Sequence, residues 1–197
     1  MNSILLIGAG GHARSIIDII QSTHPNATIC LVGKPHEVGT SVLGCRVLGT
    51  DDDLPKLREQ FNSAVLAVGQ LPDSRPRRFI LHKIHDLFFD FPVLISAHAV
   101  VSKHSQISPG TVIGHGVIIN SNSVIGSHCI INSCALIEHD VKIADHCHVS
   151  TGALVNGGVV LGEGCFVGSG AILREHLSLP SDTIISAGKR VMGWPLS

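Results

Sequence analysis

One aliphatic residue recurs at every sixth position through the second half of the chain, without interruption. The series has seventeen members and runs from Ile95 through Ile113, Ile131 and Val149 to Val191. A period of six matches neither an α-helix, whose faces repeat about every 3.6 residues, nor an ordinary strand with its alternation of two faces. Fixed self-similarity of this kind predicts a parallel β-helix of hexapeptide repeats, in which short strands wind around a triangular prism.

A second column of smaller residues lies two positions before each member of the series. It includes Cys129, Cys147 and Cys165, which are eighteen residues apart. One bulky and one small inward residue per hexad suit a narrow prism, and the glycines between them suit its corners. If three hexads form one coil, residues eighteen apart lie above one another at about 4.8 Å. We therefore expect a left-handed parallel β-helix over residues 93–197, with the three cysteines packed in its wall as free thiols.

The first ninety residues show a different pattern, in which short apolar strands alternate with helices. Strands are expected at residues 3–7, 28–32 and 64–68, and helices at residues 14–22, 51–60 and 77–87. Alternation at this spacing predicts a small parallel sheet with right-handed crossovers. The chain is therefore expected to divide near residue 92 into a Rossmann-like α/β domain, residues 1–92, and the β-helix, residues 93–197.

A glycine-rich turn connects the first expected strand to the first expected helix. Gly8, Gly10 and Ala13 match the spacing G-x-G-x-x-G/A in the strand–turn–helix setting that this motif requires. Glycines let phosphate oxygens approach the backbone N–H groups at a helix N-terminus. The domain has half the strands of a dinucleotide fold, and Gly33 and Lys34 stand where a ribose-binding acid is expected. The motif favours a phosphate-bearing acceptor over NAD, with a purely structural glycine turn as the alternative.

Charge and hydropathy argue against several classes of function. The 197 residues carry a formal net charge of −1, which gives no basis for binding nucleic acid or a membrane surface. No apolar stretch is long enough for a transmembrane helix, and no signal-peptide pattern is visible. The cysteines and histidines lack metal-ligand spacing. We expect a cytoplasmic protein that binds small molecules and holds no metal.

Two sequence segments together resemble a known family. A Gly-Ala-Gly-Gly-His-Ala loop, fused to hexapeptide repeats that contain Ile-Glu-His-Asp at residues 137–140, resembles the sialic acid O-acetyltransferase / UDP-amino-sugar N-acetyltransferase family. The resemblance covers essentially the whole chain. It implies a homotrimer with acetyl-CoA as the donor, bound in the cleft between the β-helices of adjacent subunits. It also implies that the glycine loop binds the sugar acceptor.

The resemblance assigns roles to particular residues. It implies that His139 is the general base, with Asp140 as its partner and Asn132 placed near it. The residues implied for acetyl-CoA are His148, Gly157, Ser169 and Ala187. Those implied for the acceptor are Gly8, Gly10, Gly11, His12 and Lys34. Relatives that bind UDP-sugars tend to have an acidic residue after the second strand, and the sequence departs from that pattern at residues 33–34.

Histidine suits acyl transfer independently of the resemblance. An amine or hydroxyl must lose a proton to attack a thioester, and an imidazole with a pKa of about 6.5 can accept it near neutral pH. A carboxylate partner fixes the tautomer of the imidazole, and Glu138 and Asp140 both flank His139. A backbone N–H at a coil corner would stabilise the thioester oxyanion. No serine or cysteine nucleophile motif is evident, so direct transfer without an acyl-enzyme is expected.

We therefore expect an acetyl-CoA-dependent N-acetyltransferase that acts on a UDP-linked 4-amino-sugar in bacterial glycan biosynthesis. The alternative is O-acetylation of sialic-acid-like sugars, and a more remote one is a trimeric binding protein without catalysis. A γ-class carbonic anhydrase shares the β-helix but needs two zinc-binding histidines five residues apart. No two histidines in this sequence have that spacing.

Overall fold

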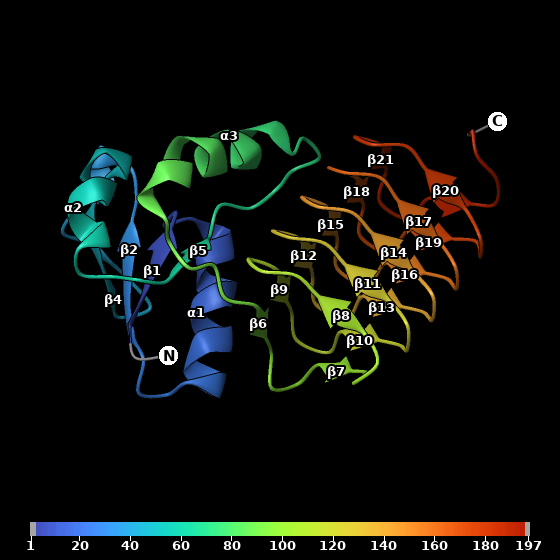
Figure 1. Ribbon diagram of the computed structural model, residues 1–197, viewed down its shortest axis with the longest axis horizontal. Helices are drawn as coiled ribbons and strands as arrows, with labels where there is room; N and C mark the ends of the chain where they lie inside the picture. Colours follow the sequence, from blue (N-terminus) through green and yellow to red (C-terminus); the bar gives the residue numbers. More distant parts are fainter. Residues whose placement is uncertain (1–2, 196–197) are drawn as a thin grey trace. The chain divides into compact units, whose positions relative to one another are not determined.

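The structure, a computed structural model, describes residues 3–195, which form two compact units. Among the described residues, the first unit comprises 3–69 and 76–92, and the second comprises 70–75 and 93–195. Figure 1 shows both units and labels their α-helices and most of their strands. None of the helices described in residues 3–195 has both the length and the apolar character needed to cross a membrane.

The first unit is built on a five-stranded sheet. Its strands are β1 (Ser3–Ile7), β2 (Thr28–Val32), β3 (Ser41–Val42), β4 (Cys45–Gly49) and β5 (Ala64–Leu66). They lie in the order β3-β4-β2-β1-β5, and every pair is parallel except β3 with β4. The three expected strands are confirmed. The β3–β4 hairpin was not expected, because its turn residues Leu43 and Gly44, both with positive φ, lack the usual Asn-Gly signature.

Three helices accompany the sheet of the first unit. They are α1 (Gly11–Thr23), α2 (Leu54–Arg58) and α3 (Arg75–Ile84), with 3-10 turns η1 (Pro35–Glu37), η2 (Asp51–Asp53) and η3 (His85–Leu87). Leu5 and Ile7 of β1 pack in one cluster with residues of α2 and α3. Ile4 and Leu6, which alternate with them, are fully buried as well. Both faces of β1 are therefore covered, which explains why its sequence is a continuous apolar run.

The second unit is a left-handed parallel β-helix whose described part contains seventeen two-residue strands. The first face contains β6 (Leu94–Ile95), β9 (Val112–Ile113), β12 (Ile130–Ile131), β15 (His148–Val149), β18 (Phe166–Val167) and β21 (Ile184–Ile185). The second face contains β7 (Val100–Val101), β10 (Ile118–Ile119), β13 (Leu136–Ile137), β16 (Leu154–Val155), β19 (Ile172–Leu173) and β22 (Arg190–Val191). The third face contains β8 (Gln106–Ile107), β11 (Val124–Ile125), β14 (Lys142–Ile143), β17 (Val160–Leu161) and β20 (Ser178–Leu179). Each strand pairs with the one eighteen residues away, as expected.

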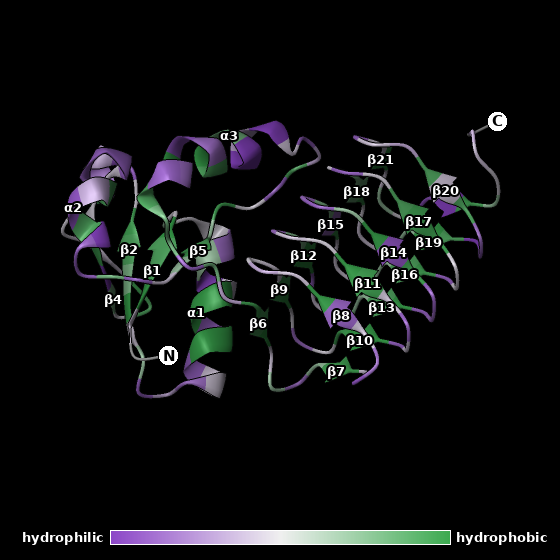
Figure 2. Ribbon diagram, in the orientation of Figure 1, coloured by the Kyte–Doolittle hydropathy of each residue, from purple (hydrophilic) through white to green (hydrophobic). Residues whose placement is uncertain are grey.

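The aliphatic series fills the centre of the β-helix. From Ile113 to Val191 every member is at most 3% exposed. Ile95, Val101 and Ile107 are more exposed, because they belong to the first coil, which has another coil on one side only. Each fully buried aliphatic side chain contributes roughly 1.5–3 kcal/mol. The strands that carry the series are mostly hydrophobic in Figure 2.

Three of the smaller residues that lie two positions before the aliphatic series are cysteines, Cys129, Cys147 and Cys165, called here the cysteine column. All three are free thiols and at most 1% exposed. The Sγ atoms of Cys129, Cys147 and Cys165 lie 3.1–3.2 Å from the carbonyl oxygens fifteen residues onward. Hydrogen bonding with its two neighbouring thiols, together with burial, raises the pKa of Cys147. The expectation of packed free thiols is confirmed.

The turns between faces form three corners of the prism. Corner A joins the first face to the second, corner B the second to the third, and corner C the third to the first. Corner A includes residues 132–135, 150–153, 168–171 and 186–189, corner B residues 120–123, 138–141, 156–159 and 174–177, and corner C residues 126–129. Each of these turns contains one residue with φ near +60°, such as Asn122 and Asp140 at corner B. These left-handed positions turn the chain sharply and stack from coil to coil.

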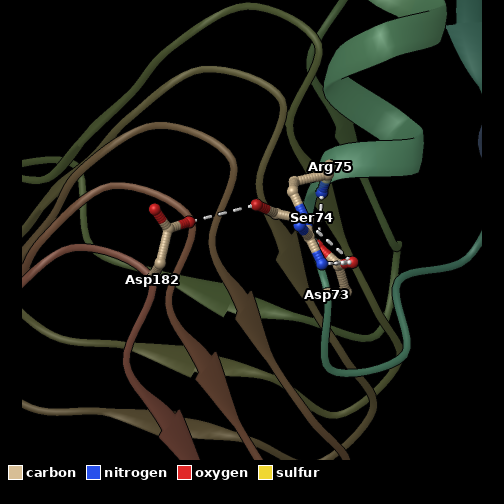
Figure 3. Close-up of polar contacts among 4 residues, drawn as sticks. All are labelled: Asp73, Ser74, Arg75 and Asp182. Atoms are coloured by element: carbon tan, nitrogen blue, oxygen red, sulfur yellow. Dashed lines mark hydrogen bonds and ion pairs between the residues drawn. The ribbon is translucent and has the colours of Figure 1, made fainter.

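The segment Gln70–Arg75 contacts the β-helix of the second unit. The carbonyl oxygen of Gln70 accepts a hydrogen bond from Nδ1 of His148 at 2.8 Å. Ser74 Oγ lies 3.4 Å from Oδ1 of Asp182 at corner C (Figure 3). Arg75 pairs with the carboxylate of Asp73 at 2.8 Å and lowers the pKa of that carboxyl group. The segment is therefore tied to the β-helix at two of its coils.

Candidate active site

His139 and Asp140 lie together at corner B, directly after β13. Nδ1 of His139 is 2.7 Å from Oδ2 of Asp140. Asp140 has a φ of +61°, so the chain turns between the two residues and their side chains do not point to opposite sides, as they would in a strand. This geometry supports Asp140 as the partner of the histidine.

The hydrogen bonds around Asp140 define the state of the imidazole. Hydrogen bonds from Asn122 and then from His139 lower the pKa of Asp140, so its carboxylate is ionised at neutral pH. An ionised carboxylate only accepts hydrogen bonds, so Nδ1 of His139 carries the proton. In the neutral imidazole the lone pair is then on Nε2. With 61% of the side chain exposed, His139 presents a base to its surroundings.

Glu138, the other acid beside His139, has different partners. Its carboxylate accepts a hydrogen bond from Nδ2 of Asn120 at 2.9 Å. Its backbone carbonyl accepts one from Oγ of Ser123 at 2.7 Å. Of the two flanking acids, Asp140 is therefore the one whose carboxylate is hydrogen-bonded to His139.

Two adjacent glycines on the next coil make room for two imidazoles. A Cβ atom at Gly157 would lie 2.9 Å from Cε1 and 3.0 Å from Nε2 of His139. A Cβ atom at Gly158 would overlap the ring of His176, which comes from the coil beyond. Gly157, expected on the acetyl-CoA path, thus lies directly against the ring of His139.

Asn132 and His148 form a second group, near corner A. His148 is 6% exposed, its ring meets Phe166 edge-on with 5.2 Å between centroids, and Nδ1 donates to the carbonyl of Gln70. Nε2 of His148 lies 3.4 Å from Nδ2 of Asn132. Asn132 was expected near His139, but β13 separates the two residues. Within one chain the structure places Asn132 beside His148.

Ser169 and Ala187 lie on the same edge of the prism as Asn132. Both are at corner A, on successive coils, and Ser169 Oγ is 2.9 Å from Oγ of Ser150. The residues expected to bind acetyl-CoA therefore fall into two groups. Gly157 lies with His139 at corner B, whereas His148, Ser169 and Ala187 lie on the first face and corner A, across the second face of the same chain.

The glycine loop lies at the carboxyl end of β1. Gly8 has a φ of +117°, and a Cβ there would lie 2.8 Å from Cγ2 of Val68, so a side chain is excluded. Gly10 and Gly11 are exposed, a Cβ atom at either would meet nothing within 4 Å, and α1 begins at Gly11. Because β1 lies between β2 and β5, the strand order reverses at this point, where ligands bind in open α/β sheets. The loop thus offers open N–H groups at a helix N-terminus.

The remaining predicted acceptor residues lie around the same sheet edge. His12 is half-buried in the first turn of α1, and Lys34 is exposed two residues after the end of β2. Glu37 was not predicted, and its carboxylate accepts the N–H of Lys34 at 2.7 Å. A Cβ at Gly33 would lie 2.7 Å from that carboxylate and 3.0 Å from Cβ of Ala9 in the glycine loop. An acid is therefore present at the end of β2. The sequence contains a pattern that could have indicated this acid, because Pro35 begins a short helical turn and Glu37 is the third residue of that turn.

Comparison with known proteins places these features in a family. Residues 3–84 match the model of the PglD N-terminal domain. No curated protein sequence matches the chain. A mutant of perosamine N-acetyltransferase from Caulobacter crescentus, in complex with CoA and GDP-perosamine, is 33% identical with a TM-score of 0.89, over 98% of this chain and 89% of that one.

Two further solved structures share the architecture. The acetyltransferase domain of PglB from Neisseria gonorrhoeae, in complex with acetyl coenzyme A, is 30% identical with a TM-score of 0.87, over 97% of this chain and 93% of that one. WeeI from Acinetobacter baumannii AYE is 17% identical with a TM-score of 0.77, over 98% of this chain and 95% of that one, which shows the fold alone. The chain therefore belongs to the sugar acyltransferase family that its sequence resembles, the two-domain hexapeptide-repeat acyltransferases.

Proposed function

We propose that the chain transfers the acetyl group of acetyl-CoA to the amine of a nucleotide-linked amino sugar. The observation that carries this proposal is the His139–Asp140 pair, whose geometry leaves Nε2 as a base on an exposed corner. Relatives with 30–33% identity carry acetyl coenzyme A in one case and CoA with GDP-perosamine in another. The expected UDP-linked acceptor is thereby widened to nucleotide-linked amino sugars in general.

The chemistry proceeds as direct transfer. Nε2 of His139 accepts a proton from the amine as its nitrogen attacks the thioester carbon. A carbon–nitrogen bond forms, and the negative charge that develops on the carbonyl oxygen is stabilised by a backbone N–H at the corner. The carbon–sulfur bond then breaks, and the imidazolium returns its proton to the departing CoA thiolate. The ionised Asp140 stabilises that imidazolium while it exists.

A homotrimer with its sites between adjacent subunits is part of the proposal. The residues that the family resemblance assigns to one site lie on two edges of a single prism, Asn132, His148, Ser169 and Ala187 near corner A and His139 at corner B. Packing corner A of one subunit against corner B of the next joins both groups, and a three-fold ring closes this contact. In the trimer, each active site would therefore contain the corner A residues of one subunit and His139 of the next.

The glycine loop supports a phosphate-bearing acceptor. Gly10 and Gly11 are exposed at the N-terminus of α1, where backbone N–H groups and the helix dipole favour an anion. Glu37 provides a carboxylate at the end of β2, in the place where such folds bind ribose hydroxyls. The six free thiols support a location in the reducing cytoplasm.

The proposal is tested by thiol release from acetyl-CoA. Purified protein is offered UDP- and GDP-linked amino sugars and free sialic acid, with His139→Ala as the matched variant. We expect turnover with a nucleotide-linked amino sugar, at least about a hundredfold less turnover in the variant, and unchanged acetyl-CoA binding by calorimetry. If only sialic acid is acetylated, the protein is an O-acetyltransferase and the proposal of N-acetylation is wrong. Full turnover in His139→Ala would show that His139 is not the general base.

A further inference from the structure

Asn122 lies one coil before Asp140 in the stack of left-handed positions at corner B. Its Nδ2 atom donates a hydrogen bond to Oδ1 of Asp140 at 2.5 Å. The other carboxylate oxygen, Oδ2, accepts from Nδ1 of His139 at 2.7 Å. Both oxygens of Asp140 are therefore occupied, one by the preceding coil and one by the base.

The backbone at corner B gives Asn122 a fixed position. Its φ of +61° is the same as that of Asp140, and its N–H is hydrogen-bonded to the carbonyl of His104 on the coil before. Asparagine tolerates this left-handed conformation better than most residues, and its amide is short enough to reach the stacked residue eighteen positions onward. The backbone of the coil therefore holds the Asn122 amide within hydrogen-bond reach of Asp140.

We propose that Asn122 is a positioning residue, which holds the Asp140 carboxylate so that it orients His139 for proton transfer. The inference rests on the proposed role of His139 as the base. Without the amide, the exposed carboxylate of Asp140 is free to rotate about its side-chain bonds, and the Nδ1 hydrogen bond that fixes the imidazole is lost for part of the time. Asn122 acts only through Asp140, since its Nδ2 bond ends there.

Other ionisable groups also lie on the stacked turns of this corner. His176, from the coil beyond Gly158, interacts electrostatically with Asp140 and favours its ionised form. The ionisable residues on the stacked turns of corner B, besides His139 and Asp140, are Lys103, His104, Glu138, Arg174, Glu175 and His176. Substitution of the neutral Asn122 leaves all of these charges in place.

The test is a double-mutant cycle in the full chain, with Asn122→Gly, Asp140→Asn and the combination. Glycine accepts the positive φ, so the turn is preserved while the amide is removed. We expect Asn122→Gly to lower kcat about tenfold, with little change in the KM of acetyl-CoA. Loss of the amide also raises the pKa of Asp140, because the Asn122 hydrogen bond is the largest cause that lowers it, so the part of the kcat/KM profile that needs the ionised carboxylate moves to higher pH. In the Asp140→Asn background, Asn122→Gly causes no further loss.

His128→Gly is the matched control, because it removes a side chain from the same left-handed position at corner C. It leaves kcat and the pH profile unchanged. Unchanged kinetics of Asn122→Gly, or equal losses with and without the Asp140 carboxylate, would overturn the inference. If His139→Ala keeps full turnover, the role of the base fails instead, so the two failures are distinguishable. Melting temperatures and acetyl-CoA binding show that each variant is folded.

Discussion

The contact between Gly157 and His139 gives the sharpest single-residue prediction for this active site. A Cβ atom at Gly157 would lie 2.9 Å from Cε1 and 3.0 Å from Nε2 of the imidazole. Carbon atoms in ordinary contact are about 3.5–4.0 Å apart, so Gly157→Ala must displace the ring by about 0.6–1 Å. Nδ1 is held by Asp140 at 2.7 Å, so the displacement swings Nε2 away from its position or stretches that hydrogen bond.

The magnitude follows from the sensitivity of proton transfer to geometry. A misplacement of about 1 Å costs roughly a hundredfold in rate, so we expect kcat of Gly157→Ala to fall about 10–100-fold. The fold should tolerate the change, because Gly157 does not have a positive φ and the exposed ring can move into solvent. We expect the melting temperature to change by less than about 4 °C, which corresponds to roughly 1 kcal/mol in a chain of this length.

The assay is steady-state thiol release with saturating acetyl-CoA and acceptor, together with thermal unfolding. Glu175→Ala is the matched control, because residue 175 occupies the same position one coil onward. The control keeps its kcat. A kcat of Gly157→Ala within twofold of the parent, in a folded protein, would refute the view that His139 works from the position the structure shows.

Three further predictions concern the glycine loop, the pH dependence and the thiols. Gly8→Ala forces a side chain to a φ of +117° against Val68 and should lower the free energy of unfolding by about 2–4 kcal/mol in urea titration; a change below about 0.5 kcal/mol would contradict this. The pKa of Asp140 is lowered, so its stabilising effect is present above about pH 4 and is lost only as the pH falls through its folded-state pKa. Above about pH 4 the kcat/KM profile should therefore show no transition that Asp140→Asn removes, and such a transition would contradict the lowered pKa of Asp140. In the native protein the three thiols of the cysteine column should resist a thiol reagent until the chain is unfolded in urea, and rapid modification of the folded protein at these positions would contradict their burial.

The β-helix was predictable from the sequence because its repeat is both strict and long. Each face of each coil places one bulky residue in the interior, so the aliphatic series alone was enough to predict the core. The cysteine column was predictable for the same reason, since eighteen residues make one coil. The β3–β4 hairpin was missed, because β3 has only two residues and its turn begins with Leu43.

The partner of His139 could not be chosen from sequence, since Glu138 and Asp140 are equally close along the chain. The choice depends on the turn at Asp140 and on Asn120, which binds Glu138 from the preceding coil. Within one chain a face of the prism lies between Asn132 and His139, so the placement of Asn132 near the histidine stays a prediction that depends on the proposed assembly. Glu37 was overlooked, since η1 returns its carboxylate to the end of β2 from a position three residues beyond Lys34.

Acetylation of an amine on a nucleotide-linked sugar is tested most directly with a matched pair of acceptors. One is the nucleotide-linked amino sugar, and the other is the same nucleotide sugar with a hydroxyl group in place of the amine. Acetyl-CoA consumption and the mass of the product are measured for both. We predict that only the amino sugar gains an acetyl group and that the gain disappears with His139→Ala. Equal or faster acetylation of the hydroxyl acceptor would contradict the assignment as an N-acetyltransferase.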